Sequence, residues 1–519
     1  MPLSGSEEFI EELLQRTFRS TEGHVQVMKG CDVNGHSLIC DGFNMPILVT
    51  EKDGLRMRVP PENFMPEDLL KFMGINCFSG RNCHIDPNFI VDVIDVRLQA
   101  EVQMALGDFV GHFVSKHRVR LLNMLSLEFS QTSLSKLVEP PHVVSELSLI
   151  SNCWITAPDD EFGEVSDDGS SVTSIPSVQK YCLMSMKGSY TDFHIDFGGS
   201  SVWYHVVWVR HFAYVYNILQ GEKIFYLIPP THENRRAYWR WIWNPDHRTI
   251  FLPDLLGVPK DEPKPPVFEL HVGPGQTILL PAGWIHAVYT PSDCLVFGGN
   301  FLSELHIPIQ LSVYRMEQKS ETPRKFQFPN FEKIHWFVAD CIAGRLTNAL
   351  YDNREPAAYE IEAAHALAKV LPRWLEKRLT LPPDERLYYL PSRATMELSY
   401  SQLIDKLEEL SSILLPTPCK GRCSSIKPEK SKLDHSDKHS SGKSKSSVHE
   451  ETVKQRSVYP SSTPKRSAGG GLGWLPDRAM RQKSSDVDQT VTGNQPVTED
   501  QDILEALPEL NESRLIGDH

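Results

Sequence analysis

Tyr190-Thr-Asp-Phe-His194-Ile-Asp196-Phe-Gly-Gly199 is the stretch that decides the fold, and a second stretch, Gly283-Trp-Ile-His286-Ala-Val288, follows it far along the chain. A His and an Asp two positions apart point to the same side of a β-strand. A His on a neighbouring strand can then add a third ligand on the same face of a metal ion. The two stretches therefore predict a metal centre built from His194, Asp196 and His286.

Two His and one carboxylate on one face of a metal leave three coordination positions open, which is the arrangement of non-haem Fe(II) oxygenases. The short motif alone is weak, because the chain has 20 His and chance supplies about one His-x-Asp. Two further copies occur: His84-Ile-Asp86 runs directly into Pro87, and His435-Ser-Asp437 lies in a Lys/Ser-rich tract. Neither precedes a series of strands that ends in a third ligand, so both are interpreted as chance matches.

The sequence that follows His194 is typical of a β-sheet protein. Short runs rich in β-branched and aromatic residues are separated by Gly and Pro turns, as an antiparallel jelly roll requires. The runs are Val202–Val206, Lys223–Ile228, Val267–Val272, Gln276–Leu280, Trp284–Thr290 and Cys294–Phe297. They predict a mainly β catalytic core, a cupin-like double-stranded β-helix, with the ligands on its strands.

An isolated His on a strand is usually a satisfied polar residue rather than a ligand. For His194, the nearby Asp, the Gly-Gly pair and the distal Gly-Trp-Ile-His reverse that expectation. His205 and His271 are the alternative ligands. His205 is one step out of phase with Tyr204 on its strand, and His271 precedes a Gly-Pro-Gly turn, so both are interpreted as packing or supporting residues.

A set of ordered motifs is far more specific than a single triad. The runs in question are Tyr181–Ser185, Tyr190–Gly199, Val202–Val206, Gly221–Ile228 and Gly298–Phe301. The segment from about 179 to 302 that contains them resembles a Jumonji C domain. It is most similar to one branch, the PHD-finger/Jumonji histone demethylases of the lysine demethylase seven family, and the similarity extends over roughly residues 8 to 345.

The resemblance implies a role for each matching residue. His194, Asp196 and His286 would hold Fe(II). Lys223, Thr191 and Tyr204 would bind 2-oxoglutarate. Tyr181 and Asn300 would lie near the iron or the methylated lysine. A fixed cation is needed where the distal carboxylate of the co-substrate is buried. From the residues alone, the ordinary roles are favoured: Lys223 as a surface strand lysine, Thr191 as a strand residue and Tyr204 as a core aromatic.

The resemblance also implies a reaction that uses dioxygen and 2-oxoglutarate to oxidise an N-methyl group of lysine. Formaldehyde, succinate and carbon dioxide would be released. The expected substrates are mono- and dimethyl-lysine on histone tails, chiefly lysine nine and lysine twenty-seven of the third core histone. Two alternatives stay open, a Jumonji hydroxylase acting on another protein side chain or a small molecule, and a catalytically impaired chromatin scaffold.

The twelve residues from 207 to 218 depart from the family pattern, since they separate Tyr204 from Lys223. An apolar, aromatic insert is a poor exposed loop, because it presents an adhesive strand edge. One interpretation is an extended hairpin that packs on the barrel rim or binds a partner. The other is an error in the gene model. A displaced Lys223 would bind the co-substrate weakly, which motivates the scaffold alternative.

Family members usually carry a PHD finger, which needs a Cys/His series that holds two zinc ions. Residues 1–76 contain only Cys31 and Cys40. We therefore expect no PHD finger in this chain, as in a truncated isoform or an incomplete sequence.

The chain is expected to have four parts. Residues 1–150 form an α+β support that starts with a helix capped by Ser6, residues 151–317 the barrel, residues 318–415 a helical region, and residues 416–519 a disordered Lys/Ser-rich tail. In the helical region, Leu403, Leu407, Leu410 and Ile413 recur at helical spacing.

Composition indicates an intracellular protein. The ten Cys lack disulfide spacing, and no signal peptide or apolar run of membrane-spanning length is present. The net charge of −14 argues against a DNA-binding protein as a whole, although Lys427–Lys445 and Thr463–Arg466 predict nuclear import or weak phosphate contacts. The expected location is the nucleus, and the expected partners are methylated histone tails within nucleosomes. Oligomeric state is not predicted.

Overall fold

The computed structural model describes residues 1–61, 64–73, 89–155, 175–207, 209–213, 216–259 and 262–414, with the backbone alone for 209–213 and 216–220. The two other His-x-Asp motifs, at 84–86 and 435–437, lie outside the described residues. So do the tail beyond residue 414, its predicted disorder and its predicted phosphate contacts.

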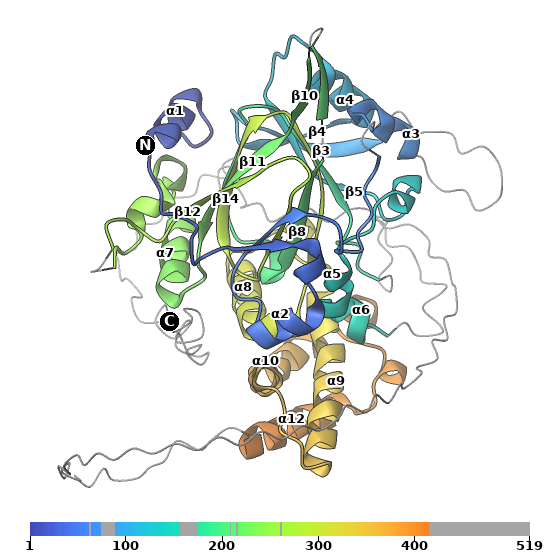
Figure 1. Cartoon of the computed structure of the whole chain (residues 1–519). Coiled ribbons are helices and arrows are strands. Elements are labelled where there is room, and N and C mark those ends of the chain that lie inside the picture. Colours follow the sequence, from blue (N-terminus) through green and yellow to red (C-terminus); the bar gives the residue numbers. More distant parts are fainter. Residues whose placement is uncertain are drawn as a thin grey trace, which may run out of the picture.

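Two mainly antiparallel sheets form the core (Figure 1). The larger has nine strands in the order β1-β2-β13-β8-β15-β6-β5-β3-β4, with β1 and β2 parallel. Its strands are β1 (Gln26–Lys29), β2 (Ile47–Glu51), β3 (Ile90–Asp95), β4 (Ala100–Ala105), β5 (Leu122–Glu128), β6 (Tyr181–Ser185), β8 (Ser201–Val207), β13 (Thr277–Leu280) and β15 (Cys294–Phe301).

The smaller sheet has four antiparallel strands in the order β12-β11-β14-β7. They are β7 (Tyr190–His194), β11 (Glu222–Ile228), β12 (Phe268–Val272) and β14 (Ile285–Ser292). One buried cluster joins the sheets, since it holds Leu183 and Val296 of the larger and Phe225 of the smaller. The predicted jelly-roll core is therefore confirmed, and its interior lies between β7, β11 and β14 on one side and β6, β8 and β15 on the other.

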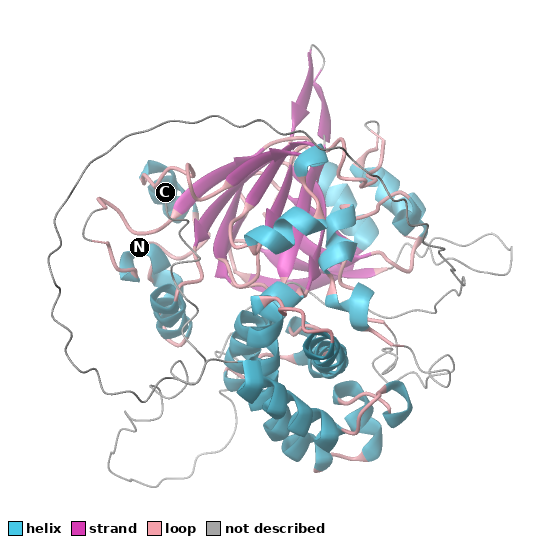
Figure 2. Ribbon diagram, turned by 60° about the horizontal axis from the view of Figure 1, so that its bottom comes forward, coloured by secondary structure: helices cyan, strands magenta, loops and turns pink. Residues whose placement is uncertain are grey.

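The insert after β8 forms a hairpin. Its strands, β9 (Val209–Ala213) and β10 (Tyr216–Gln220), pair only with each other within the described residues, and the hairpin extends away from the barrel (Figure 2). The flanking residues Val207 and Gly221 lie together, because a Cβ on Gly221 would be 3.1 Å from the Val207 carbonyl oxygen. The chain therefore leaves and re-enters the barrel at nearly one point, and β11 keeps both of its neighbours.

The N-terminal region supports the barrel from outside. Helix α1 (Glu7–Gln15) begins as predicted at Ser6, whose hydroxyl accepts a hydrogen bond from the Phe9 amide at 3.2 Å. Phe9 is buried, and its ring centre lies 4.9 Å from that of Tyr190 in β7. The other helices before and within the barrel are α2 (Gly35–Asp41), α3 (Leu69–Phe72), α4 (Leu106–Val114), α5 (His142–Leu147), α6 (Leu149–Cys153) and α7 (His232–Ile242).

A helical region follows the barrel and lies below it in Figure 1. It comprises α8 (Ile307–Lys319), α9 (Phe331–Tyr351), α10 (Ala358–Leu379), α11 (Pro383–Tyr389) and α12 (Tyr400–Leu414). The predicted helical region is confirmed, although it begins at α8, inside the segment predicted as barrel. Three of the four predicted apolar residues of α12 are buried, whereas Ile413 is 58% exposed.

Candidate metal centre

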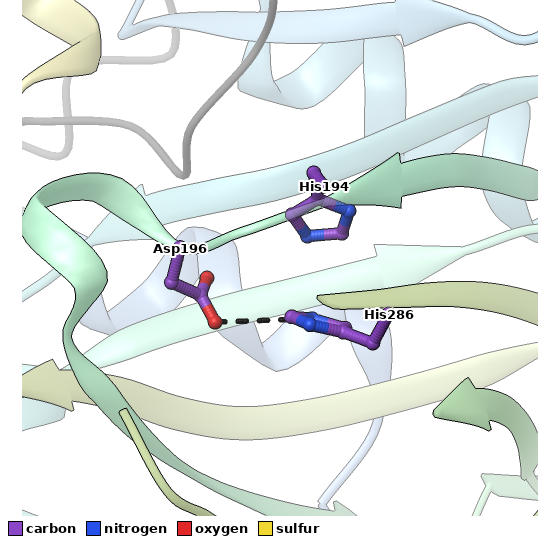
Figure 3. A group of neighbouring side chains, drawn as sticks. All are labelled: His194, Asp196 and His286. Atoms are coloured by element: carbon purple, nitrogen blue, oxygen red, sulfur yellow. Dashed lines mark ion pairs between the residues drawn. The ribbon is translucent and has the colours of Figure 1, made fainter. Parts of the chain in front are cut away.

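Three predicted ligands meet on the smaller sheet (Figure 3). His194 ends β7, Asp196 follows two residues later, and His286 is the second residue of β14. Because β14 pairs with β7, His286 stands directly opposite His194. Antiparallel pairing thus unites residues that are far apart in the sequence.

The donor atoms of the triad lie within 4.8 Å of one another. His286 Nε2 is 3.8 Å from Asp196 Oδ2, and all three side chains are buried. The Nδ1 atoms of both His residues are within hydrogen-bond distance of backbone carbonyls, at 2.8 Å from Asp192 O for His194 and 3.1 Å from Trp284 O for His286. Donation from Nδ1 leaves each Nε2 as a lone-pair donor for a metal ion.

Burial shifts the pKa values of all three ligand side chains. It lowers the pKa of His194 to about 4, with a further contribution from His286, and lowers the pKa of His286 to about 4 as well. It raises the pKa of Asp196 to about 6, against the opposing effects of His194 and an Asn300 hydrogen bond. At pH 7 the imidazoles are neutral and the carboxyl group is ionised, as ligation requires.

One oxygen of the triad has no protein partner. Asp196 Oδ1 is buried and makes no hydrogen bond to the described residues. A buried carboxylate oxygen without a partner is costly. A divalent cation coordinated by two imidazoles and a carboxylate would remove that cost, so the donor set fits Fe(II).

A buried cavity of about 30 Å³ adjoins the triad. Thr191, Tyr204 and Lys223 line it together with His194 and His286. Its remaining lining is apolar: Leu125, Leu183, Val206, Phe225, Val288 and Val296. The three predicted co-substrate residues therefore lie in one cavity with two of the predicted metal ligands, and the insert has not displaced Lys223.

Lys223 has a buried ammonium group that faces hydroxyl groups. Its Nζ donates to Ser185 Oγ at 2.5 Å and to Thr290 Oγ1 at 2.9 Å. Burial lowers the pKa of Lys223 to about 8, and no carboxylate of the described residues forms an ion pair with it. A buried cation of this kind could hold an anion.

Sequence reasoning missed the polar network around Lys223. Ser185 Oγ donates to Asn123 Oδ1 at 2.6 Å, and Asn123 Nδ2 lies 3.4 Å from Thr191 Oγ1. With Thr290, these residues come from four strands, β5, β6, β7 and β14. The available signal was weak: Ser185 ends an otherwise apolar run, and the other three residues lie in strands that hold further polar residues. The network becomes recognisable only once the strand order is known.

The two residues predicted near the iron or substrate differ in position. Asn300 lies on β15, donates to Ser200 Oγ at 3.0 Å and contacts the Asp196 carboxyl group. Tyr181 lies on β6 and is fully buried, and it does not line the cavity beside the triad. Gly298 separates Tyr181 from Tyr204 in the register, and a Cβ there would be 2.8 Å from the Tyr204 ring. A side chain at this position would therefore displace Tyr204.

The alternative ligands lie elsewhere. His205 is buried on β8, with Nδ1 2.9 Å from Thr277 Oγ1. His271 is on the surface between Glu222 and Glu269, at 2.7 and 3.0 Å. The structure thus brings neither of them to the triad.

Comparison with known proteins agrees with this geometry. Residues 181–301 match the JmjC domain, described as a hydroxylase, and residues 305–409 match the Jumonji helical domain. The chain therefore contains a JmjC domain followed by a Jumonji helical domain. The first match contains all three residues of the triad, and the second covers α8 to α11 and part of α12.

Curated JmjC relatives carry demethylase names. The chain is 39% identical over 402 residues to lysine-specific demethylase 7B of Danio rerio. The aligned region covers 76% of this chain and 62% of that protein. It is 40% identical to lysine-specific demethylase 7A of Danio rerio, over 74% of this chain and 38% of the relative. It is also 40% identical to histone lysine demethylase PHF8 of Danio rerio, and this match covers 72% of this chain and 32% of the relative. The predicted family resemblance is confirmed, and the matched region spans about one third to 62% of these relatives.

Among the described residues, no helix is both long enough and apolar enough to cross a membrane.

Proposed function

We propose that this JmjC protein is an Fe(II)- and 2-oxoglutarate-dependent lysine demethylase that acts on histone tails. The observation that carries the proposal is the cavity that His194 and His286 of the triad share with Lys223. A three-ligand metal face beside a buried cation fits a co-substrate that chelates a metal at one end and presents a carboxylate at the other. The demethylase names of the relatives supply the substrate class.

The residues in and beside the cavity have separate roles in the proposed reaction. His194, Asp196 and His286 would hold Fe(II), which, when bound, supplies the redox chemistry that activates dioxygen. Lys223 would bind the distal carboxylate of 2-oxoglutarate through its ammonium group, with Thr191 donating a hydroxyl and Tyr204 contacting the same molecule. The apolar walls exclude water, which strengthens the contact between Lys223 and the anion.

The overall reaction is balanced by these reactants. One oxygen atom of dioxygen ends in succinate as 2-oxoglutarate loses carbon dioxide, and the other becomes the hydroxyl of an N-hydroxymethyl group. That group breaks down to formaldehyde and the demethylated amine. Asn300 and Tyr181, on the neighbouring strands β15 and β6, are proposed to stand near the metal or the methylated lysine. Pocket size would restrict the substrate to mono- and dimethyl-lysine.

The proposal places the protein in the nucleus, where its substrates are. The basic segments beyond residue 414, argued from sequence alone, would add salt-dependent contacts to DNA phosphates of nucleosomes.

The test is mass spectrometry of dimethyl-lysine histone peptides incubated with the purified full chain, Fe(II), ascorbate and 2-oxoglutarate. Stepwise loss of methyl groups with formaldehyde release, absent from His194→Ala, is the expected result. A stable gain of one oxygen on the peptide would instead establish a hydroxylase. Iron binding without 2-oxoglutarate binding or turnover would support the scaffold alternative and contradict the proposal.

A further inference from the structure

The turn that carries Asp196 is enclosed by the helical region. After Asp196 the chain enters a short 3₁₀ turn, η5 (Phe197–Gly199), in which Gly198 and Gly199 have φ of 62° and 61°. Only glycine adopts such angles without strain. An added Cβ on Gly199 would lie 3.0 Å from Val313 of α8, and one on Gly198 would lie 3.0 Å from Phe331 of α9. The backbone next to a metal ligand is therefore packed against two helices outside the barrel.

Glu317 of α8 makes a side-chain hydrogen bond to this turn. Its Oε1 accepts from the Gly198 amide at 2.6 Å, and its Oε2 is buried without a partner among the described residues. Burial raises the pKa of Glu317 to about 8, although the Gly198 bond lowers it in part. The group is therefore mainly a neutral acid at pH 7, and a neutral acceptor of the same shape can replace it.

A second helix holds the residue before Asp196. Burial raises the pKa of Tyr238 of α7, and a hydrogen bond from the Ile195 backbone to its hydroxyl opposes that rise. Ile195, Tyr238 and Glu317 line one cavity of about 40 Å³ behind the turn. The chain before Asp196 thus lies near Tyr238 of α7, and the turn after Asp196 is hydrogen-bonded to Glu317 of α8.

Asn300 contacts the Asp196 carboxyl group, but Asp196 Oδ1 has no partner among the described residues. The direction of the carboxylate therefore depends also on the backbone from which it projects. Removal of a group that orients a metal ligand typically weakens metal binding by roughly 10- to 100-fold.

We propose that Glu317 is a positioning residue of the metal centre: through its bond to Gly198 it fixes the turn that directs Asp196 at the metal. Glu317 touches neither the metal nor the co-substrate, and it acts through the backbone. The helical region thereby becomes part of the catalytic unit, since one of its side chains sets the direction of a ligand. The inference rests on the metal centre of the proposed function and is independent of the substrate.

The test measures Co(II) binding to the full chain, with Co(II) as a spectroscopic substitute for Fe(II), by titration and visible absorption at pH 7. Glu317→Ala is expected to weaken Co(II) binding roughly 10- to 100-fold and to alter the absorption bands, because Asp196 is no longer fixed. Glu317→Gln is expected to retain affinity and spectrum, since its amide oxygen accepts the same hydrogen bond. Glu317→Asp is a second, milder variant whose shorter side chain cannot reach Gly198.

Glu332→Gln is the matched control. This buried carboxylate of α9 accepts from Tyr314 at 2.8 Å and pairs with Arg378 at 2.6 Å, and neither of these contacts is made to the turn. Its substitution should lower the melting temperature and leave Co(II) affinity unchanged, which separates positioning from general stability.

Wild-type affinity and spectrum in folded Glu317→Ala, or in Glu317→Asp where the Ala variant does not fold, would overturn the inference. A Gln variant as weak as the Ala variant would overturn it too. If the wild type binds Co(II) no better than His194→Ala does, the assignment of the metal centre is wrong. That result would contradict the proposed function and is distinct from a failure of the inference about Glu317.

Discussion

His286 stands directly opposite His194 in the antiparallel pair of β14 and β7, with the two ring centres 4.2 Å apart. The pair shows how the metal centre depends on strand order, because β14 is separated from β7 by most of the barrel sequence. Asp196 joins from the turn that leaves β7. A register shift of one residue would turn His286 to the opposite face of the sheet.

Loss of one ligand should abolish tight metal binding. His286→Ala is expected to weaken Co(II) or Fe(II) affinity more than about 100-fold, because even residues that only support a ligand are worth 10- to 100-fold. Metal content after dialysis, together with a titration, measures this. His271→Ala is the control, since His271 is exposed and remote from the triad. An unchanged metal content in His286→Ala would refute the assignment.

Metal affinity should fall as pH decreases below about 6. Burial raises the pKa of Asp196 to about 6 and lowers the pKa values of His194 and His286 to about 4. Below pH 6 the metal must therefore displace one proton, from Asp196, and affinity should fall about tenfold per pH unit. Below about 4 the imidazoles also compete and the slope steepens. Co(II) titrations from pH 5 to 8 test this, and a flat profile between 5 and 6 would contradict it.

Lys223 should control affinity for 2-oxoglutarate. Lys223→Ala leaves the distal carboxylate without a cation, and we expect a loss of about 2 to 5 kcal/mol of binding free energy, or roughly 30-fold or more in Kd. Calorimetry on the Co(II)-loaded protein measures the change. Lys325→Ala, which removes a half-exposed lysine paired with Glu101, is the control. Equal affinity in both variants would show that Lys223 does not bind the co-substrate.

A pH dependence follows from the same lysine. Burial lowers the pKa of Lys223 to about 8, so the free protein loses the positive charge as pH rises through 8. The Kd for 2-oxoglutarate should therefore increase above pH 8 in the wild type, while Lys223→Ala shows no such increase. A wild-type Kd that is constant from pH 7 to 9 would contradict this expectation.

The ligands were predictable from sequence because two of them are so close in the chain, although Asp196 lies in the turn after β7 and not on the strand face that the spacing predicted. His194 and Asp196 are two residues apart, and His205 could be set aside from its phase on the strand. Asn123 and Ser185 were not predictable, since polar residues of this kind occur in many strands without a function. Their function depends on β5 and β6 lying next to each other and near β7, β11 and β14, which is a property of tertiary structure.

The apolar repeat of α12 gives a stability prediction. Leu407 is fully buried in the core shared with α9 and α10, whereas Ile413 is 58% exposed. Leu407→Ala should reduce the free energy of unfolding by about 2 to 5 kcal/mol through loss of buried surface and creation of a cavity. Ile413→Ala should change it by less than about 0.5 kcal/mol. Chemical denaturation of both variants tests the difference, and equal effects would contradict the observed packing.

Removal of the β9–β10 hairpin should leave co-substrate binding intact. Val207 and Gly221 lie together at its base, and Lys223 reaches Ser185 and Thr290 with the hairpin present. A short Gly-Asn-Gly link in place of residues 208–220 should therefore preserve the Kd for 2-oxoglutarate, because β11 is held by β12 and β14 rather than by the hairpin. Calorimetry compares the shortened chain with the wild type. A large loss of affinity would show that the hairpin supports the cavity, and a gain would show that it hinders the co-substrate, as the scaffold alternative requires.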